Sequence, residues 1–287
     1  MSNTTSPTWG LGRNRHCQQV IPIAAVGTLS LGKVTNMLRM LAIGGGELRE
    51  GETLSLDRRA CELTGKRKPN ALFVPTASND SEGYIQAFTK VYGKKLGCRV
   101  QSLCLLANPN HREITEKILD ADLIYVGGGN TLRMMQVWRR LGVDAELNRA
   151  ARRGTVLCGL SAGAICWFRY GHSDSRSFSG QAEWSHIRVR GLDLVPLLFC
   201  PHYDSEKRTR PLRQMLSARG GRAIACDDMA ALEIVGDGYR ALAATTDART
   251  VFLRKVKGRI LANCLPLTLH YRPLVELTGD EYPNERK

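Results

Sequence analysis

Residues 159–163, Gly-Leu-Ser-Ala-Gly, constrain the fold of this chain more than any other stretch. They follow directly on a β-like run at 155–158, and the G-x-S-x-G pattern is typical of a sharp strand–turn–helix junction that lifts one hydroxyl clear of a sheet. Glycine suits such a bend because it tolerates backbone angles that other residues avoid. With 28 glycines in the chain, the pattern alone is weak evidence, and a purely structural turn is the alternative. The strand-like run before it favours Ser161 as a candidate nucleophile.

Strand-like and helix-like patterns alternate along the rest of the chain. Short apolar runs at 38–43, 71–74 and 123–126 each end at glycine or proline, and helical spacing of apolar residues follows the later two. This alternation is typical of parallel βαβ units. We therefore predict an α/β fold with a doubly wound, mostly parallel sheet flanked by helices, as in flavodoxin-like proteins. Three further strand-like runs, at 231–235, 239–244 and 250–255, predict a small C-terminal β-meander.

One domain is predicted over residues 37–279, because no linker and no internal repeat interrupts the pattern. Residues 1–36 contain no Asp or Glu, and we expect a disordered extension there. A transit peptide and a secretory signal are the alternatives, although the short apolar stretch at 20–26 lacks a convincing cleavage site. Residues 280–287 are mostly charged and are expected to fray.

The net charge of +14 raises the alternative of a nucleic-acid partner. Lys and Arg are spread thinly, without aromatic interleaving or zinc-finger spacing, so a solvated basic surface is favoured. The nine cysteines include no C-x-x-C pair, which indicates reduced thiols in a cytoplasmic protein rather than a metal site. No run approaches the roughly 20 apolar residues of a membrane span. We therefore expect no metal, no membrane partner and no nucleic acid.

Two glycine-rich turns, at 44–46 and 127–129, end strand-like runs. Neither matches G-x-G-x-x-G, because Arg49 and Leu132 stand where the third glycine belongs, and neither ends in Gly-Lys-Ser/Thr. We therefore predict no dinucleotide site, no ATP site and no organic cofactor. The second turn precedes Asn130, the expected N-cap of a helix, so its backbone N–H groups are expected to face the cleft and can hold an oxyanion.

Two polar residues, His202 and Asp228, each follow shortly after an apolar run. If those strands run parallel to the strand before Ser161, the three side chains share the carboxyl edge of the sheet, where open α/β folds bind ligands. A serine hydroxyl needs an adjacent base, which histidine supplies near neutral pH, and a carboxylate fixes the histidine tautomer. His172, which comes soon after the junction, is the alternative base.

Three motifs reinforce one another: Val-Gly-Gly-Gly-Asn-Thr at 126–131, Gly-Leu-Ser-Ala-Gly-Ala at 159–164 and Pro-His-Tyr at 201–203. Together they resemble the dipeptidase E (aspartyl dipeptidase) and cyanophycinase family of serine peptidases, over roughly residues 40–256. The resemblance implies a fold related to class I glutamine amidotransferases. Those enzymes carry cysteine where this chain has Ser161, which argues against ammonia-producing amidotransfer.

The resemblance also implies roles for individual residues. Ser161 corresponds to the nucleophile and His202 to the general base, while the backbone N–H groups of Gly129 and Ala162 correspond to the oxyanion hole. No metal or organic cofactor is implied.

The acid of the catalytic triad and the substrate contacts are less sharply marked. The acid looks like Asp228, and Asp227 is its main rival because it replaces a proline that some relatives carry. Relatives favour an N-terminal aspartate in the substrate, which calls for a nearby cation. Arg208 is the candidate clamp, with a solvated helix start as its alternative, and His172 and Asn130 are candidate substrate contacts.

These observations predict a cytoplasmic serine hydrolase, specifically an exopeptidase or dipeptidase that cleaves small peptides through an acyl-enzyme on Ser161. One alternative is a catalytically inactive binding protein on the same scaffold. The other is a basic nucleic-acid-binding protein. No sequence feature predicts an oligomeric state.

Overall fold

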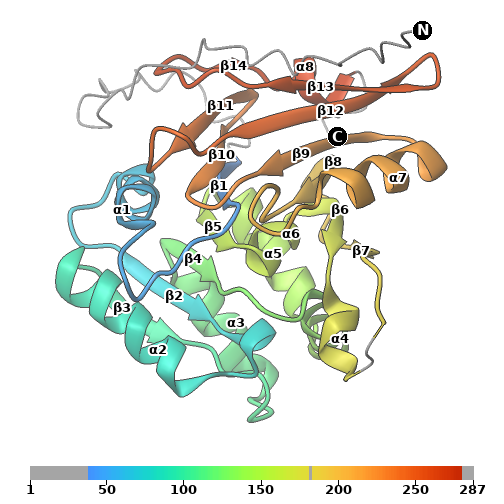
Figure 1. Cartoon of the computed structure of the whole chain (residues 1–287). Helices are drawn as coiled ribbons and strands as arrows, with labels where there is room; N and C mark the ends of the chain where they lie inside the picture. Colours follow the sequence, from blue (N-terminus) through green and yellow to red (C-terminus); the bar gives the residue numbers. More distant parts are fainter. Residues whose placement is uncertain (1–37, 181–182, 280–287) are drawn as a thin grey trace, which may run out of the picture.

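The computed structural model describes residues 38–180 and 183–279, and two β-sheets run through this part of the chain (Figure 1). Helices flank the sheets, and most of the strands nearest the centre are parallel. The predicted α/β class, with parallel-rich sheets between helices, is therefore confirmed. The extension predicted at 1–36 and the frayed tail predicted at 280–287 lie outside the described residues.

The first sheet has eight strands in the order β14-β11-β10-β1-β5-β4-β2-β3. The five strands from β1 to β3 in this order run parallel to their neighbours, and β10, β11 and β14 add antiparallel strands beside β1. Parallel neighbours need a crossover connection, which explains the helices between them. The bounds are β1 Arg39–Ile43, β2 Asn70–Val74, β3 Arg99–Ser102, β4 Leu123–Val126, β5 Val156–Leu160, β10 Ala230–Val235, β11 Gly238–Ala243 and β14 Arg272–Pro273.

The second sheet has six strands in the order β13-β12-β9-β8-β6-β7. Its three middle strands, β9, β8 and β6, are parallel, and antiparallel strands border them on both sides. The bounds are β6 Phe168–Ser173, β7 Ile187–Arg190, β8 Val195–Cys200, β9 Arg222–Cys226, β12 Thr250–Val256 and β13 Arg259–Cys264.

The prediction of one C-terminal β-meander was wrong, because the strands after residue 229 divide between the two sheets. They form two hairpins, β10–β11 in the first sheet and β12–β13 in the second. Each hairpin pairs with an outer parallel strand, β10 with β1 and β12 with β9. Unpaired edges expose backbone groups, so dividing the meander covers one edge in each sheet.

Helices cover both faces of the first sheet. On one face, α1 and the continuous segment α2–η2, whose second part is a π-helix, bury Leu56, Phe88 and Tyr92 against the strands. On the other face lie α3, α4 and α5, and α7 packs against the second sheet. The bounds are α1 Leu54–Leu63, η1 Thr76–Ser78, α2 Glu82–Phe88, η2 Thr89–Lys95, α3 His111–Asp120, α4 Thr131–Leu141, α5 Val143–Arg152, α6 Ala162–Ile165, η3 Ser175–Ser179, α7 Thr209–Arg219 and α8 Val275–Thr278.

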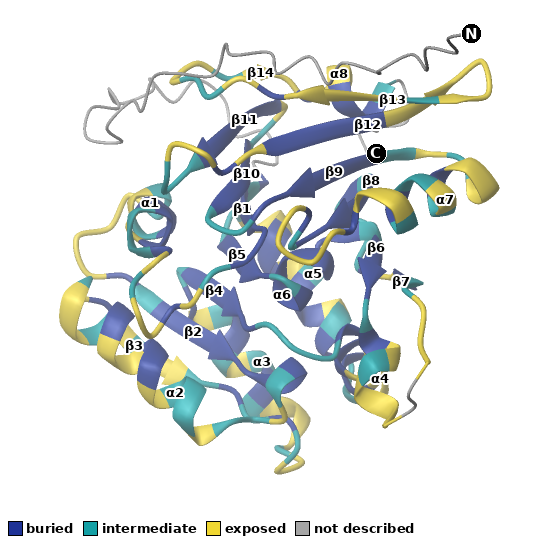
Figure 2. Cartoon of the chain, in the orientation of Figure 1, coloured by how far each residue is buried: buried dark blue, intermediate teal, exposed yellow. Residues whose placement is uncertain are grey.

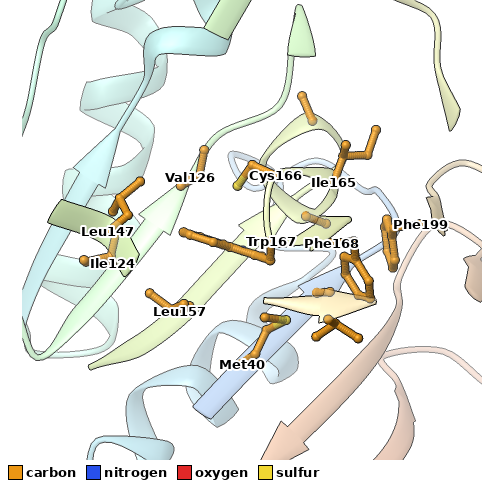
Figure 3. Packing of buried hydrophobic residues seen from close by; sticks show 14 of the residues in the cluster. Met40, Ile124, Val126, Leu147, Leu157, Ile165, Cys166, Trp167, Phe168 and Phe199 are labelled. Carbon is orange, nitrogen blue, oxygen red and sulfur yellow. The ribbon is translucent and has the colours of Figure 1, made fainter. Parts of the chain in front are cut away.

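The two sheets share one apolar cluster, which fixes their relative position. Met40 and Leu157 from the first sheet belong to the same buried cluster as Phe168 and Phe199 from the second (Figure 3). The rings of Phe168 and Phe199 stack with centroids 4.8 Å apart, and Trp167 beside them is fully buried. Figure 2 shows that the central strands of both sheets are buried. Because protein cores pack densely, this cluster holds the strand ends of the two sheets at fixed separations.

A buried carboxyl group, that of Asp57, anchors the first turn of α1. Asp57 accepts hydrogen bonds from Thr53 Oγ1 at 2.8 Å and from Tyr92 Oη at 2.9 Å. Burial raises the pKa of Asp57 to about 7, although both hydrogen bonds lower it. The methyl group of Thr53 lies close to the glycine turn at 44–46, since a Cβ added at Gly46 would be 2.9 Å from it.

We expect Asp57 to make stability depend on pH. Its pKa is raised on folding, so between about pH 4 and 7 the folded state holds a proton that the unfolded state has released, and stability falls as pH rises by up to ~1.4 kcal/mol per unit. Asp57→Asn removes this slope, so the urea midpoint of the variant should rise relative to that of the wild type between pH 4.5 and pH 7. The exposed Asp237→Asn is the matched control. Parallel pH curves for wild type and Asp57→Asn would contradict the assignment.

Candidate active site

Ser161 stands at the carboxyl end of β5 in a strained backbone conformation. Its φ is 53° and its ψ is −111°, a region that non-glycine residues seldom occupy and that costs about 1–3 kcal/mol. The surrounding hydrogen bonds hold it there. Its N–H donates to the carbonyl of Ile43 at 3.1 Å, and its own carbonyl accepts from Ala164 and Ile165 at 3.0 Å each. Strain of this kind is typical of functional positions.

The two glycines that flank Ser161 are required by close backbone packing. A Cβ at Gly159 would lie 2.1 Å from the carbonyl oxygen of Gly163, and a Cβ at Gly163 would lie 2.0 Å from that of Val126. Backbone atoms cannot move aside as a flexible side chain can. The two glycines of the G-x-S-x-G pattern are therefore needed because α6 packs closely against β5 and β4.

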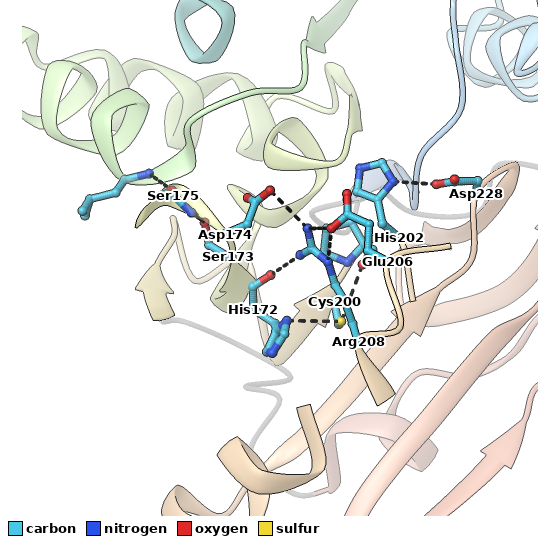
Figure 4. Close-up of polar contacts among 11 residues, drawn as sticks. His172, Ser173, Asp174, Ser175, Cys200, His202, Glu206, Arg208 and Asp228 are labelled. Atoms are coloured by element: carbon cyan, nitrogen blue, oxygen red, sulfur yellow. Dashed lines mark hydrogen bonds and ion pairs between the residues drawn. The ribbon is translucent and has the colours of Figure 1, made fainter. Parts of the chain in front are cut away.

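His202 and Asp228 form a hydrogen-bonded pair beyond the ends of two neighbouring parallel strands, β8 and β9 (Figure 4). The distance between His202 Nδ1 and Asp228 Oδ1 is 2.6 Å, and the two side chains are 21% and 30% exposed. The hydrogen bond from His202 lowers the pKa of Asp228, so this carboxylate stays ionised. With Nδ1 donating to Asp228, Nε2 of His202 is the nitrogen that can accept a proton.

Two consecutive residues at the end of β1, Ile43 and Gly44, bind the backbones of Ser161 and His202, although the strands before Ser161 and His202 belong to different sheets. Ser161 N–H donates to the carbonyl of Ile43, and His202 N–H donates to that of Gly44 at 3.3 Å. We expected the strands of Ser161, His202 and Asp228 to share one sheet, and this was wrong, because β5 lies in the first sheet and β8 and β9 in the second. The Ser161 hydroxyl makes no hydrogen bond with His202 within residues 38–180 and 183–279, and such bonds are often long without substrate.

Gly45 was missed as a site residue when the turn at 44–46 was tested only against nucleotide motifs. Its carbonyl accepts from Met229 N–H at 2.9 Å. A Cβ at this position would lie 1.9 Å from Asp228 Oδ1 and 2.4 Å from His202 Nδ1. Glycine therefore leaves the space that the His202–Asp228 pair fills. Three glycines directly after a buried strand were the available signal.

Gly45→Ala is expected to displace the pair while leaving the fold intact. The colliding atoms are the ends of two side chains, which can move, so we expect little change in unfolding temperature. A displacement of about 1 Å at a reacting group costs roughly 10²-fold in rate, and we expect kcat to fall by at least that factor. Gly93→Ala, whose added Cβ would make only a 3.5 Å contact, is the control. Full activity in Gly45→Ala would show that the pair does not need this space.

The turn after β4 brings backbone donors beside Ser161. A Cβ at Gly128 would lie 3.5 Å from the Cβ of Ser161. Gly129 has φ 134° and packs against Ala77, whose carbonyl oxygen would lie 2.2 Å from an added Cβ. Neither Gly129 nor Ala162 has a partner for its backbone N–H in the described part of the chain. Two free donors on either side of a serine can hold an oxyanion.

Asn130 serves the helix that follows the turn. Its Oδ1 accepts from Arg133 N–H at 3.0 Å, as predicted for the N-cap of α4, and its Nδ2 donates to the carbonyl of Ser175 at 3.5 Å. Its backbone N–H donates to Ala77 at 2.9 Å. These bonds already use the polar groups that would contact a substrate.

Asp227 binds Arg249, whereas the hydrogen bond of His202 Nδ1 goes to Asp228. Oδ2 of Asp227 accepts from the backbone N–H of Arg249 at 3.1 Å and from Nε of the same residue at 3.0 Å. Burial raises the pKa of Asp227, and these hydrogen bonds lower it. The geometry thus favours Asp228 over Asp227 as the partner of His202.

His172 and Arg208 lie inside the molecule rather than at the mouth of the site. His172 is fully buried on β6. Burial lowers the pKa of His172 to about 2, which disqualifies it as a general base near neutral pH. Arg208 is 1% exposed, and its guanidinium binds Glu206 at 2.5 Å and Asp174 at 3.4 Å and donates to the carbonyl of His172 at 2.9 Å (Figure 4). Because His172 is fully buried and the charge of Arg208 is paired internally, neither side chain is exposed to a substrate.

Neither a metal cluster nor a membrane helix is found in the described part of the chain. Across residues 38–180 and 183–279, no three His, Cys, Asp or Glu side chains gather as a metal site would require. In the same residues, no helix has the length and apolar character needed to cross a bilayer.

Comparisons with known proteins find a peptidase family and several peptidases. The sequence profile of peptidase family S51 matches residues 40–242. The uncharacterized peptidase YgaJ of Bacillus subtilis strain 168 is 37% identical over 204 residues, which cover 70% of this chain and 85% of that protein. Peptidase E of Citrobacter koseri is 33% identical over 167 residues, covering 54% and 67%. The crystal structure of a peptidase from an acI-B1 Actinobacterium aligns with a TM-score of 0.63 over 83% of this chain and 98% of its own, and its 19% identity shows the fold alone.

Proposed function

The chain belongs to peptidase family S51, and from this premise we propose that it is a serine peptidase with Ser161 as nucleophile, His202 as general base and Asp228 as the orienting acid. The observation that carries the proposal is the end of β1. There, consecutive carbonyls of Ile43 and Gly44 hold the strained Ser161 and the Asp228-bound His202.

In the proposed reaction, Ser161 Oγ attacks the carbonyl carbon of the peptide bond while His202 Nε2 takes the hydroxyl proton. A carbon–oxygen bond forms, and the carbonyl oxygen becomes an oxyanion. When the carbon–nitrogen bond breaks, His202 returns the proton to the leaving amine, and the acyl group remains on Ser161. Water then attacks the ester carbon and gives a proton to His202. The bond between that carbon and Ser161 Oγ breaks, the carboxylic acid leaves, and His202 passes the proton back to the serine oxygen. Asp228 supports the imidazolium throughout.

We assign the oxyanion hole to the backbone N–H groups of Gly129 and Ala162. The support is their lack of partners in the described residues and the position of the 127–129 turn against Ser161. Such donors act where charge develops, in a site that is already ordered before the reaction.

The proposed substrate is a small peptide, cleaved by exopeptidase or dipeptidase action. Support comes from relatives named Peptidase E and from the resemblance of the three sequence motifs to dipeptidase E. A preference for N-terminal aspartate belongs to the same proposal, but Arg208 no longer supports it because its charge is paired internally. The described cysteines are free thiols, which fits the proposed cytoplasmic location.

A fluorophosphonate probe tests the proposal, because only an activated serine reacts with it. We expect labelling of the native protein at Ser161, found by peptide mapping, and none in Ser161→Ala. Ser217→Ala, which removes an exposed serine on α7, is expected to label like the wild type. A dipeptide library then identifies substrates, with and without N-terminal aspartate.

Two outcomes would contradict the proposal. A native protein that resists the probe and cleaves no library member would be a binding protein on this scaffold. Labelling that persists in Ser161→Ala would place the nucleophile elsewhere.

A further inference from the structure

A hollow lies away from the proposed catalytic residues, between β7 with the segment before it and α7, which lie on the same side of the molecule (Figure 1). Its volume is about 570 Å³, within the range of small-molecule sites. We call it the arginine pocket, because Arg176, Arg188 and Arg219 line it together with His186. None of the residues proposed for catalysis lines it.

The three guanidinium groups carry charge that the described residues do not neutralise. Arg176, Arg188 and Arg219 make no ion pair within residues 38–180 and 183–279. Arg219 lies in the last turn of α7, where the helix dipole offers only a partial negative charge. Three cations around one hollow repel one another unless an anion lies among them.

Arg188 is the most constrained of the three. Its guanidinium lies 3.7 Å above the ring of Tyr170, and its Nε is buried without a hydrogen-bond partner. Burial lowers the pKa of Arg188, and the charges of Arg219 and Arg169 add to this effect. A buried donor without a partner is rare in native proteins and calls for an acceptor.

His186 completes the polar lining. Its ring stacks on His172 with centroids 4.2 Å apart, and its Nε2 is buried without a partner. The carboxylates whose charges act on it are those of Asp174 and Glu206, and both already bind Arg208. Among the described residues that line the pocket, none is an Asp or Glu that could pair with the arginines.

We propose that the arginine pocket is a binding site for a small ligand that carries two or more carboxylate or phosphate groups. Planar guanidinium groups bind such oxygens in pairs, and a multivalent anion would satisfy several arginines at once. The buried Arg208, with its ion-pair partners Glu206 and Asp174 nearer the surface, connects this site with the segment of His202, since Glu206 N–H donates to the His202 carbonyl at 3.2 Å. The proposal does not depend on the activity proposed for Ser161.

Calorimetric titration of the full chain tests the site with two probes, inorganic pyrophosphate and 1,2,3-propanetricarboxylate. We expect one saturable site per chain for at least one probe, and the probe that binds tells phosphate from carboxylate ligands. Arg176→Gln/Arg219→Gln, which changes two exposed side chains, should weaken binding by about 10-fold or more. Arg188→Gln should weaken it similarly. Arg152→Gln/Arg153→Gln removes the same charge from exposed positions at the end of α5 and should weaken binding by less than about 3-fold.

Two results would overturn the proposal. One is the absence of saturable binding for both probes up to about 1 mM. The other is an equal loss in the pocket and control variants, which would mean that net charge alone attracts the anions. Circular dichroism of each variant shows that it is folded, and fluorophosphonate labelling of Ser161 reports on the proposed catalytic site independently.

Discussion

Ser161→Ala is expected to lower kcat by about 10⁶-fold while leaving the fold intact, since losing the nucleophile of a serine–histidine–acid site removes the covalent route entirely. The alanine fits the same space as the serine. The residual rate comes from the oxyanion donors and substrate binding alone. Steady-state and single-turnover assays on the best library peptide measure the effect, and KM should change far less than kcat.

Ser161→Gly separates the chemical role of this residue from its backbone strain. The variant should be as inactive as Ser161→Ala, but glycine accepts φ 53° and ψ −111° at little cost. We therefore expect its unfolding temperature to exceed that of Ser161→Ala. Peptide turnover by either variant within about 10-fold of the wild type would reject the nucleophile assignment.

The sequence predicted those parts of the structure that depend on neighbouring residues. The bend at Ser161 follows from small residues at 159 and 163, whose backbone contacts leave no room for a Cβ. The cap of α4 at Asn130 follows from a side chain that suits the first turn of a helix. The parallel strands β1, β2 and β4 follow from short apolar runs between turns.

Other parts depend on residues far apart in the chain, and the sequence did not show them. Arg208 pairs with Glu206 two residues before it, but it also binds Asp174 and the carbonyl of His172 on another segment, where the sequence suggested an exposed clamp. His172 is polar but fully buried on a strand. Gly45 is needed only because His202 and Asp228 reach it from the second sheet. None of these long-range contacts leaves a local pattern.

The division into two sheets explains why the end of β1 matters so much. A parallel sheet alone would bring its own strand ends together, but here the candidate base and acid come from β8 and β9, and the candidate nucleophile comes from β5. The turn at 44–46 is where these elements meet, since Ile43, Gly44 and Gly45 each accept a hydrogen bond from one of them. Glycine permits this close approach of His202 and Asp228, so the glycines of this turn have a use other than nucleotide binding.

Asp228→Asn is expected to lower kcat by about 10⁴-fold with the fold retained. The carboxylate accepts a hydrogen bond from Nδ1 of His202 at 2.6 Å and so keeps Nε2 free to accept the serine proton. An asparagine amide can donate to Nδ1 instead, which favours the wrong tautomer and gives no support to the imidazolium. The measurement is kcat and kcat/KM across pH on the same peptide used for Ser161→Ala.

The pH dependence of stability gives this prediction a second readout. The pKa of Asp228 is lowered on folding by its bond to His202, so this bond stabilises the fold above the ordinary aspartate range and the stabilisation is lost as pH falls through the lowered value. Asp228→Asn should therefore lose its stability difference from the wild type in acid. Asp227→Asn is the matched control, because it breaks a bond to Arg249 and should alter stability while keeping activity within about 10-fold. The reverse pattern, an inactive Asp227→Asn beside an active Asp228→Asn, would exchange the roles of the two residues.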